Sequence, residues 1–329
     1  SHKRSINPGN QLFGTLSGLQ VLQNSGAAWE DGPTMYIRGL GTTNSKNPLV
    51  LVDGFERSIK ELSSEEIESV SVLKDAVATS IYGIRGANGV ILVKTKRGSM
   101  TAPQIDFSYD FNVATPNRLP DFADGYTYAL ALNEALVNDG SLPRYSAAEL
   151  DAFKNQTYPL FYPNVDWMDV LLKKGAPTYR ATINMNGGGS LARYYVSASY
   201  VDEGGMYKVD KGLKDYNTNA NYRRWNYRLN VDMDITKTTL LKVGVSGSLD
   251  KKNEPGMSSN IWVSAMNYNP VSVPIMYSNG YTPAFGSDDE QINPWTIATQ
   301  TGYQETWNNK LQTNITLEQD FSFITKGIK

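Results

Sequence analysis

The feature that most constrains the fold is a set of segments in which apolar and polar residues alternate one by one. In the first segment, Ile105 to Val113, the odd-numbered residues are aliphatic or aromatic and the even-numbered residues are Asp, Ser, Asp and Asn. Successive side chains of a β-strand point to opposite faces, so this pattern predicts a strand with one apolar and one polar face. The same alternation recurs in residues 179–186, 194–200, 225–235, 241–249 and, less regularly, 311–323.

Two architectures contain such strands, a soluble antiparallel sandwich and a transmembrane β-barrel. The apolar faces carry no charged residue, and the charges lie on the opposite faces. A hydrophobic core and lipid both enforce this separation, so it does not distinguish the two architectures. The charged residues of the polar faces are Asp106, Asp110, Arg180, Arg193, Arg228, Asp232, Asp234, Lys242, Asp250, Glu318 and Asp320.

The lengths of the connections do distinguish them. Long and short connections alternate along the chain, whereas a sandwich has no reason to place every long loop at one end. Transmembrane barrels have short turns on one side of the membrane and long loops on the other, so the order favours a barrel. The long connections are residues 114–178, 202–224 and about 251–309, and the short ones are 187–190, 236–239 and 325–327.

The first long connection is predicted to contain helices of its own. Residues 124–137 are amphipathic, and Ser146 followed by Glu149 has the spacing of a capping box. Connections of this length are uncommon unless they form lids or binding loops.

Residues 1 to about 98 have a different pattern, in which short predicted strands and helices alternate as in a compact α/β unit. Strands are predicted at residues 47–55, 70–73 and 89–96. Ser63 has capping-box spacing to Glu66, which predicts a short helix through about residue 68. A second helix is predicted from Asp75 to Tyr82, ended by Gly83.

Composition excludes several functional classes. The 329-residue chain has no cysteine, one histidine, His2, and a formal net charge of -2. Thiolate chemistry, multi-histidine metal sites and histidine-dependent triads are therefore excluded, and a nucleic-acid partner is not expected. The chain opens without the apolar core of a signal peptide, so we expect either an intracellular protein or a sequence whose beginning is missing.

Three segments stand out in the first third of the chain: LSGLQVLQNSG, IRGLGTTNSKNPLVLVDG and IESVSVLKDAVATSIYGIRGANGVILVKTKRG. In order and spacing they resemble the plug domain of the SusC/RagA family of TonB-linked outer-membrane transporters. The resemblance implies an α/β plug domain (residues 1–98) followed by antiparallel strands of a transmembrane β-barrel (residues 99–329). About six of an expected 22 strands would be present, and the TonB box that precedes the plug in this family is absent from the sequence.

The resemblance implies TonB-dependent import of a nutrient across the bacterial outer membrane, without catalysis or a cofactor. An oligosaccharide is favoured as substrate and an oligopeptide is possible. The implied partners are a SusD-like surface lipoprotein that acts as a lid, TonB, and outer-membrane lipid. The alternatives are a non-enzymatic β-rich surface module that binds glycans, and a glycoside hydrolase. Glu65 and Glu66 do not suit a hydrolase, because adjacent residues cannot flank one glycosidic bond.

Three plug residues are candidates for anchoring the plug to the barrel. Arg38 and Arg85 each precede a glycine, and an arginine enclosed in a polar lumen needs carboxylate partners. We expect them to pair with acids of the barrel, and Asp53 is the third candidate. The alternative is that these residues form ion pairs within the plug.

The candidate substrate contacts lie in a polar plug segment and in a long loop. Amides, hydroxyls and aromatic rings suit sugar hydroxyls and sugar faces, although the aromatic residues could instead pack the loop against itself. The candidates are Thr42, Thr43, Asn44, Ser45, Asn47, Trp262, Tyr268, Tyr281 and Trp295, with Tyr277 as a further aromatic residue. Asp288 to Glu290 lack the spacing of a calcium loop, and the glycines near Gly41 lack a dinucleotide fingerprint, so no metal or nucleotide is expected.

Overall fold

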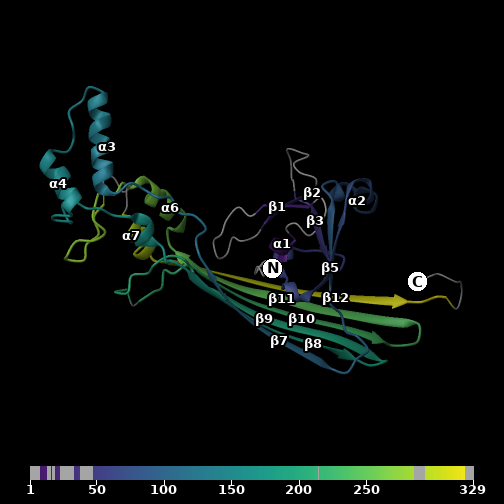
Figure 1. Ribbon diagram of the computed structural model, residues 1–329. Helices are drawn as coiled ribbons and strands as arrows, with labels where there is room; N and C mark the ends of the chain where they lie inside the picture. The colour runs from purple at the N-terminus through teal and green to yellow at the C-terminus, as the bar shows by residue number, and fades with distance from the viewer. Residues whose placement is uncertain are drawn as a thin grey trace.

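The structure is a computed structural model that describes residues 8–12, 16, 19–22, 33–37, 47–213, 215–284 and 293–322. Figure 1 shows three parts: an N-terminal α/β unit, a long six-stranded sheet on which this unit lies, and a group of loop helices at one end of the sheet. Within the described residues, no helix combines the length and the apolar character needed to cross a membrane.

The α/β unit is built around a four-stranded sheet in the order β4-β3-β6-β5. β3 and β6 are parallel, and the other pairs are antiparallel. Its elements are α1 (Pro8–Gln11), β1 (Leu19–Leu22), β2 (Thr34–Ile37), β3 (Leu49–Val52), β4 (Phe55–Glu56), η1 (Ile59–Glu61), η2 (Ser64–Glu66), β5 (Ile67–Leu73), α2 (Asp75–Tyr82), η3 (Gly83–Gly86) and β6 (Val90–Thr95). A core of aliphatic residues, with Val52, Ile91 and Val93 at its centre, is buried by this sheet and the β1–β2 hairpin.

Local sequence explains the turns of the unit. Asp53 and Gly54 both have positive φ, 51° and 90°, which makes the tight turn between β3 and β4. The helix predicted at residues 75–82 is confirmed as α2, and Gly83 ends it with φ of 60°.

The helix predicted from Ser63 to about residue 68 is wrong. Only a single 3₁₀ turn, η2, forms, and the Ser63 side chain makes no capping bond to the backbone. Its hydroxyl instead donates to Glu65 Oε2 at 2.5 Å. Residues 67–73 contain several β-branched side chains and form β5, which pairs with β6. The helix cannot continue past η2 because these residues belong to the sheet.

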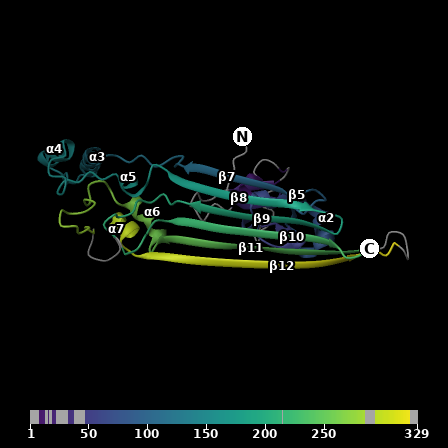
Figure 2. The same ribbon diagram turned by 90° about the horizontal axis from the view of Figure 1, so that it is seen from below.

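The six remaining strands form one antiparallel sheet in which each strand pairs with its neighbours in sequence, as Figure 2 shows. They are β7 (Gln104–Ala114), β8 (Ala176–Gly188), β9 (Ala192–Glu203), β10 (Asn221–Asp234), β11 (Thr239–Pro255) and β12 (Tyr303–Gln319). All six predicted strands are confirmed. β12 begins eight residues before the predicted Leu311 and ends before Phe321, and Phe323 lies outside the described residues.

In this sheet the polar face is buried and the apolar face is exposed, whereas a soluble sandwich buries its apolar faces. On β10, Asn226, Arg228 and Asn230 are 4%, 4% and 2% exposed, because the α/β unit lies over them. Tyr227 and Leu229, which alternate with them on the other face, are each 40% exposed. The polar face is therefore covered by protein and the apolar face is bare, as in a barrel that lies in lipid and encloses a polar interior.

The long connections gather at one end of the sheet (Figure 1), as the alternation of loop lengths predicted. Residues 115–175, 256–284 and 293–302 form a unit that we call the loop lobe. Its helices are α3 (Gly125–Asn138), α4 (Ala147–Asn155), α5 (Trp167–Leu171), α6 (Ser258–Asn267) and α7 (Pro294–Thr299). The capping box of Ser146 and Glu149 is confirmed. A core that contains Trp167, Ile261 and Ile297 joins the two connections.

Candidate functional site

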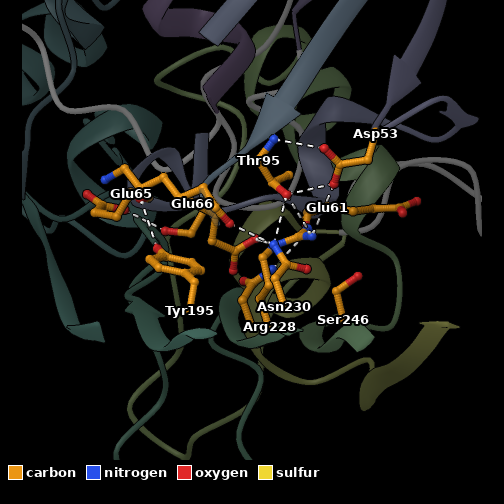
Figure 3. Close-up of polar contacts among 12 residues, drawn as sticks. Asp53, Glu61, Glu65, Glu66, Thr95, Tyr195, Arg228, Asn230 and Ser246 are labelled. Carbon is orange, nitrogen blue, oxygen red and sulfur yellow. Dashed lines mark hydrogen bonds and ion pairs between the residues drawn. The ribbon is translucent and has the colours of Figure 1, made fainter. Parts of the chain in front are cut away.

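The α/β unit meets the inner face of the six-stranded sheet through a polar interface centred on Arg228 of β10 (Figure 3). The Arg228 guanidinium donates from Nε to Glu66 Oε2 at 2.9 Å. Its Nη1 lies 3.4 Å from Thr95 Oγ1 and 3.7 Å from Asp53 Oδ2. The side chains of Arg228 and Glu66 are 4% and 2% exposed, so this ion pair has left water almost completely.

Asp53 reaches this cluster because it occupies the β3–β4 turn. Its Oδ1 accepts from the backbone N–H of Thr95 at 2.9 Å and its Oδ2 from the Thr95 hydroxyl at 2.6 Å. These bonds fix the carboxylate at the end of β6, beside the guanidinium of Arg228. The turn, the end of β6 and β10 are therefore held by one group of charges.

Neutral side chains of the inner face complete the interface by binding the backbone of the α/β unit. Asn230 donates to the carbonyl of Lys96 at 2.7 Å, and Asn226 donates to that of Glu61 at 2.7 Å. Tyr195 of β9 donates its hydroxyl to the carbonyl of Glu65 at 3.2 Å. Each contact gives a backbone carbonyl of the α/β unit a donor from the six-stranded sheet.

Further charged contacts extend the interface from β8 to β12. Arg180 Nη1 of β8 lies 3.5 Å from Glu65 Oε1, and Lys310 of β12 pairs with Glu61. In a further ion pair the α/β unit supplies the cation and the sheet supplies the anion: Arg97 Nη1 lies 2.6 Å from Asp232 Oδ1 of β10. Arg57 Nη1 donates to Ser246 Oγ of β11 at 2.7 Å.

The two adjacent glutamates of η2 differ in their electrostatics. Burial raises the pKa of Glu66, and the neighbouring guanidinium of Arg228 opposes that rise. Burial also acts to raise the pKa of Glu65, but the hydrogen bond from Ser63 and the charge of Arg180 outweigh it and lower this pKa. Glu66 is thus the member whose ionisation depends most on its partner.

The predicted anchoring residues have three different outcomes. Asp53 lies in the interface and faces Arg228. Arg85 pairs with Glu56 of β4, and both side chains are more than half exposed, so the contact seen is the alternative, an ion pair within the α/β unit. Arg38 lies outside the described residues.

The predicted substrate contacts are spread over two parts of the molecule. Asn47 is exposed just before β3, and Thr42 to Ser45 lie outside the described residues, as do Asp288 to Glu290. In the loop lobe, Trp262, Tyr277 and Tyr281 are 41%, 43% and 73% exposed. Tyr268 and Trp295 instead pack with the lobe core.

Sequence reasoning located the charges of the inner face but not their partners. The alternation places Arg180, Arg228 and Asp232 on polar strand faces. No pattern in the sequence links Glu65 and Glu66 to these faces. Their role depends on contacts more than 100 residues away in the chain, such as the 162-residue separation of Glu66 and Arg228.

Comparison with known proteins agrees with this architecture. Residues 3–90 match the family model of the TonB-dependent receptor plug domain. TonB-dependent receptor P26 of Formosa agariphila is 31% identical over 240 residues, which are 71% of this chain and 22% of the relative. TonB-dependent receptor SusC of Bacteroides thetaiotaomicron is 30% identical over 239 residues, 69% of this chain and 21% of SusC.

Among solved structures, the RagAB peptide transporter has a TM-score of 0.72 at 22% identity, covering 96% of this chain and 38% of that chain. The structural similarity therefore covers the six strands as well as the α/β unit.

An α/β plug held by the polar inner face of consecutive antiparallel strands defines a TonB-dependent receptor. Within this class, the chain belongs to the SusC/RagA family. The α/β unit is its plug, and the six strands belong to its barrel. The chain spans 21% to 27% of the length of these curated relatives.

Removal of Arg228 tests the centre of the interface. Arg228→Met leaves Glu66 buried and unpaired, so we expect the plug of the full-length receptor to lose about 3–5 kcal/mol of stability. The control is Arg223→Met on the same strand, because Arg223 pairs with Asp202 on a partly exposed surface and should contribute about 0–1 kcal/mol. Hydrogen exchange of the β6 amides measures the loss of plug stability in each variant. Equal losses in Arg228→Met and Arg223→Met would contradict the placement of Arg228 at the centre of the interface.

The same variant should make plug stability depend on pH. Without Arg228, only the charge of Arg57 and the hydrogen bond at Ser63 still oppose the effect of burial, so the pKa of Glu66 rises further above the ordinary value. A raised folded-state pKa means that stability is present at low pH and is lost as pH rises through that pKa. We therefore expect Arg228→Met to be less stable at pH 8 than at pH 5. The double variant with Glu66→Gln should show no such slope, and a slope that persists there would assign the effect to another group.

Proposed function

We propose that the chain is part of a TonB-dependent importer of nutrients in the bacterial outer membrane, with its plug closing the barrel interior. The observation that carries this proposal is the inverted burial of β8 to β10. A bare apolar face suits lipid, and a polar face filled by a separately folded unit suits a pore that is closed by a plug. A soluble glycan-binding module would have no use for an exposed apolar sheet face.

The plug contacts are of a kind that permits release. They are ion pairs and hydrogen bonds to individual side chains, and water could replace each of them in turn. A large apolar contact would have to separate all at once. A plug held in this way can be displaced when force is applied from the periplasmic side, which is the role we assign to TonB.

We propose a glycan as the substrate and a SusD-like surface lipoprotein as the lid over the loop lobe. Trp262 and Tyr281 are exposed aromatic side chains on this lobe, which suits contact with sugar faces or with a covering protein. The RagAB relative is described as a peptide transporter, so an oligopeptide is the alternative substrate that the experiment has to separate.

Purification of the full-length receptor from outer membranes tests this function. We expect a surface lipoprotein to co-purify in equal amount, and mass spectrometry of the complex to detect an oligosaccharide. Cells without TonB should fail to grow on that oligosaccharide. A bound peptide in its place would establish the alternative substrate. A receptor that appears in the soluble fraction without a lipoprotein would refute the importer and favour a surface binding module.

A further inference from the structure

The plug leads into β7 through residues 96–103, which we call the linker. The linker starts on β10, where Arg97 pairs with Asp232 at 2.6 Å. Two residues later it has reached β8, because the N–H and the hydroxyl of Ser99 donate to Asn186 Oδ1 at 3.1 and 3.2 Å. Neighbouring strands lie about 4.8 Å apart, and an extended chain advances about 3.5 Å per residue. The linker therefore crosses β9 with little slack.

Gly98 is the linker residue that lies on β9. A Cβ atom at this position would lie 2.1 Å from the backbone N of Tyr194 and 2.5 Å from the carbonyl carbon of Arg193. Gly98 is not among the glycines with positive φ, so it is the lack of space and not the backbone conformation that requires a glycine. Gly187 of β8 meets the linker in a similar way, since a Cβ there would lie 3.0 Å from Pro103 Cα. The linker and the ends of β8 and β9 thus touch backbone to backbone.

The plug is held differently at β11 and β12. Glu61 of η1 pairs with Lys310 of β12, whose side chain is 51% exposed. Arg57, just before η1, donates to Ser246 Oγ of β11 at 2.7 Å. These contacts are made by the ends of side chains, and an ion pair as exposed as that of Lys310 contributes little to stability. The attachment of η1 to β11 and β12 is therefore easier to break than the backbone packing of the linker.

A force that enters at the start of the plug reaches η1 before it reaches the linker. α1, the first element of the described chain, packs against η1. Leu12, which follows α1, packs against the core that contains Ile59 and Leu62. The linker lies at the other end of the plug sequence, after β6. The TonB box precedes the plug in this family, so we assign the pull of TonB to the end that carries α1.

We propose that the linker is a clamp, which keeps the end of the plug on β8 to β10 while a pull on the start of the plug frees η1 from the sheet. A plug that stays clamped at one side returns to the same seat after each release. The proposal rests on the proposed function, because only an importer has to displace its plug. It assigns positioning roles to Gly98 and Asn186, which hold the linker on β9 and β8.

Force spectroscopy on the full-length receptor in a lipid bilayer tests the clamp. The N-terminus is pulled from the periplasmic side, and the rupture force and the released chain length are recorded over repeated cycles of pulling and relaxation. Two cysteine pairs are compared, each joined by the same short bismaleimide. The crosslink in Glu61→Cys with Lys310→Cys should abolish release of the chain beyond residue 61. The crosslink in Ser99→Cys with Asn186→Cys should leave the rupture force for η1 unchanged, because these two residues stay together during the release.

Loosening the clamp should impair the return of the plug. Gly98→Ala pushes the linker off β9, so we expect the first rupture to be absent from the second pull of the same molecule. The matched control is Gly189→Ala in the β8–β9 turn, where no atom lies within 4 Å of the added Cβ and φ is not positive. This control should recover the rupture as the unmodified receptor does. The crosslinked pairs keep Gly98 and test the clamp even if Gly98→Ala does not fold.

Three results would each overturn the proposal. The first is a linker crosslink that raises the rupture force for η1, because the linker would then leave the sheet in the same step. The second is release beyond residue 61 despite the crosslink between positions 61 and 310. The third is equal recovery in Gly98→Ala and Gly189→Ala.

These measurements need neither substrate nor TonB, so they can fail independently of the proposed function. Any of the three results would remove the clamp and leave the importer intact. The expected rupture forces, together with a receptor that appears in the soluble fraction of cells without a lipoprotein, would retain the clamp and refute the importer.

Discussion

The buried guanidinium of Arg228 is the group on which the rest of the structure depends. A charge on the inner face of a barrel strand cannot remain there dry and unpaired, and the plug supplies Glu66 and Asp53 to compensate it. The ion pair contributes little net stability over an apolar contact, since both charges must be desolvated. In the observed seating, the end of β6, the β3–β4 turn and η2 all meet β10 at this one guanidinium. The neutral contacts of Asn226 and Asn230 follow from that seating.

The strict alternation of the strands is the condition for this arrangement. A shift of one residue in the register of β10 would turn Arg228 toward lipid and Leu229 toward the plug, so the apolar and charged faces together specify the register. The same alternation sends every long connection to one end, where two of them form the loop lobe. One periodicity of the sequence thus positions both the plug interface and the loop lobe.

The sequence predicted the elements well and their partners poorly, for physical reasons. Strands such as β7 and helices such as α2 and α4 follow from local patterns and caps, which act within a few residues. The helix at Ser63 failed because pairing of β5 with β6 overrides a local capping signal. For Arg85 the sequence leaves two pairings open, with acids of the barrel or within the plug, and the contact seen is with Glu56 of β4. Glu66 could not be matched to Arg228, because no local pattern encodes a contact across 162 residues.

The most direct test is to measure which environment each face of β10 meets. The chain has no cysteine, so single spin labels can be attached at Leu229→Cys and Asn230→Cys in a full-length receptor whose other cysteines, if any, are replaced. In lipid vesicles, the label at position 229 should be relaxed by oxygen, which concentrates in the bilayer, and not by a water-soluble nickel chelate. The label at position 230 should be shielded from both by the plug. Relaxation of the label at position 229 by the nickel chelate, with none by oxygen, would contradict a membrane barrel that holds its plug on the polar face.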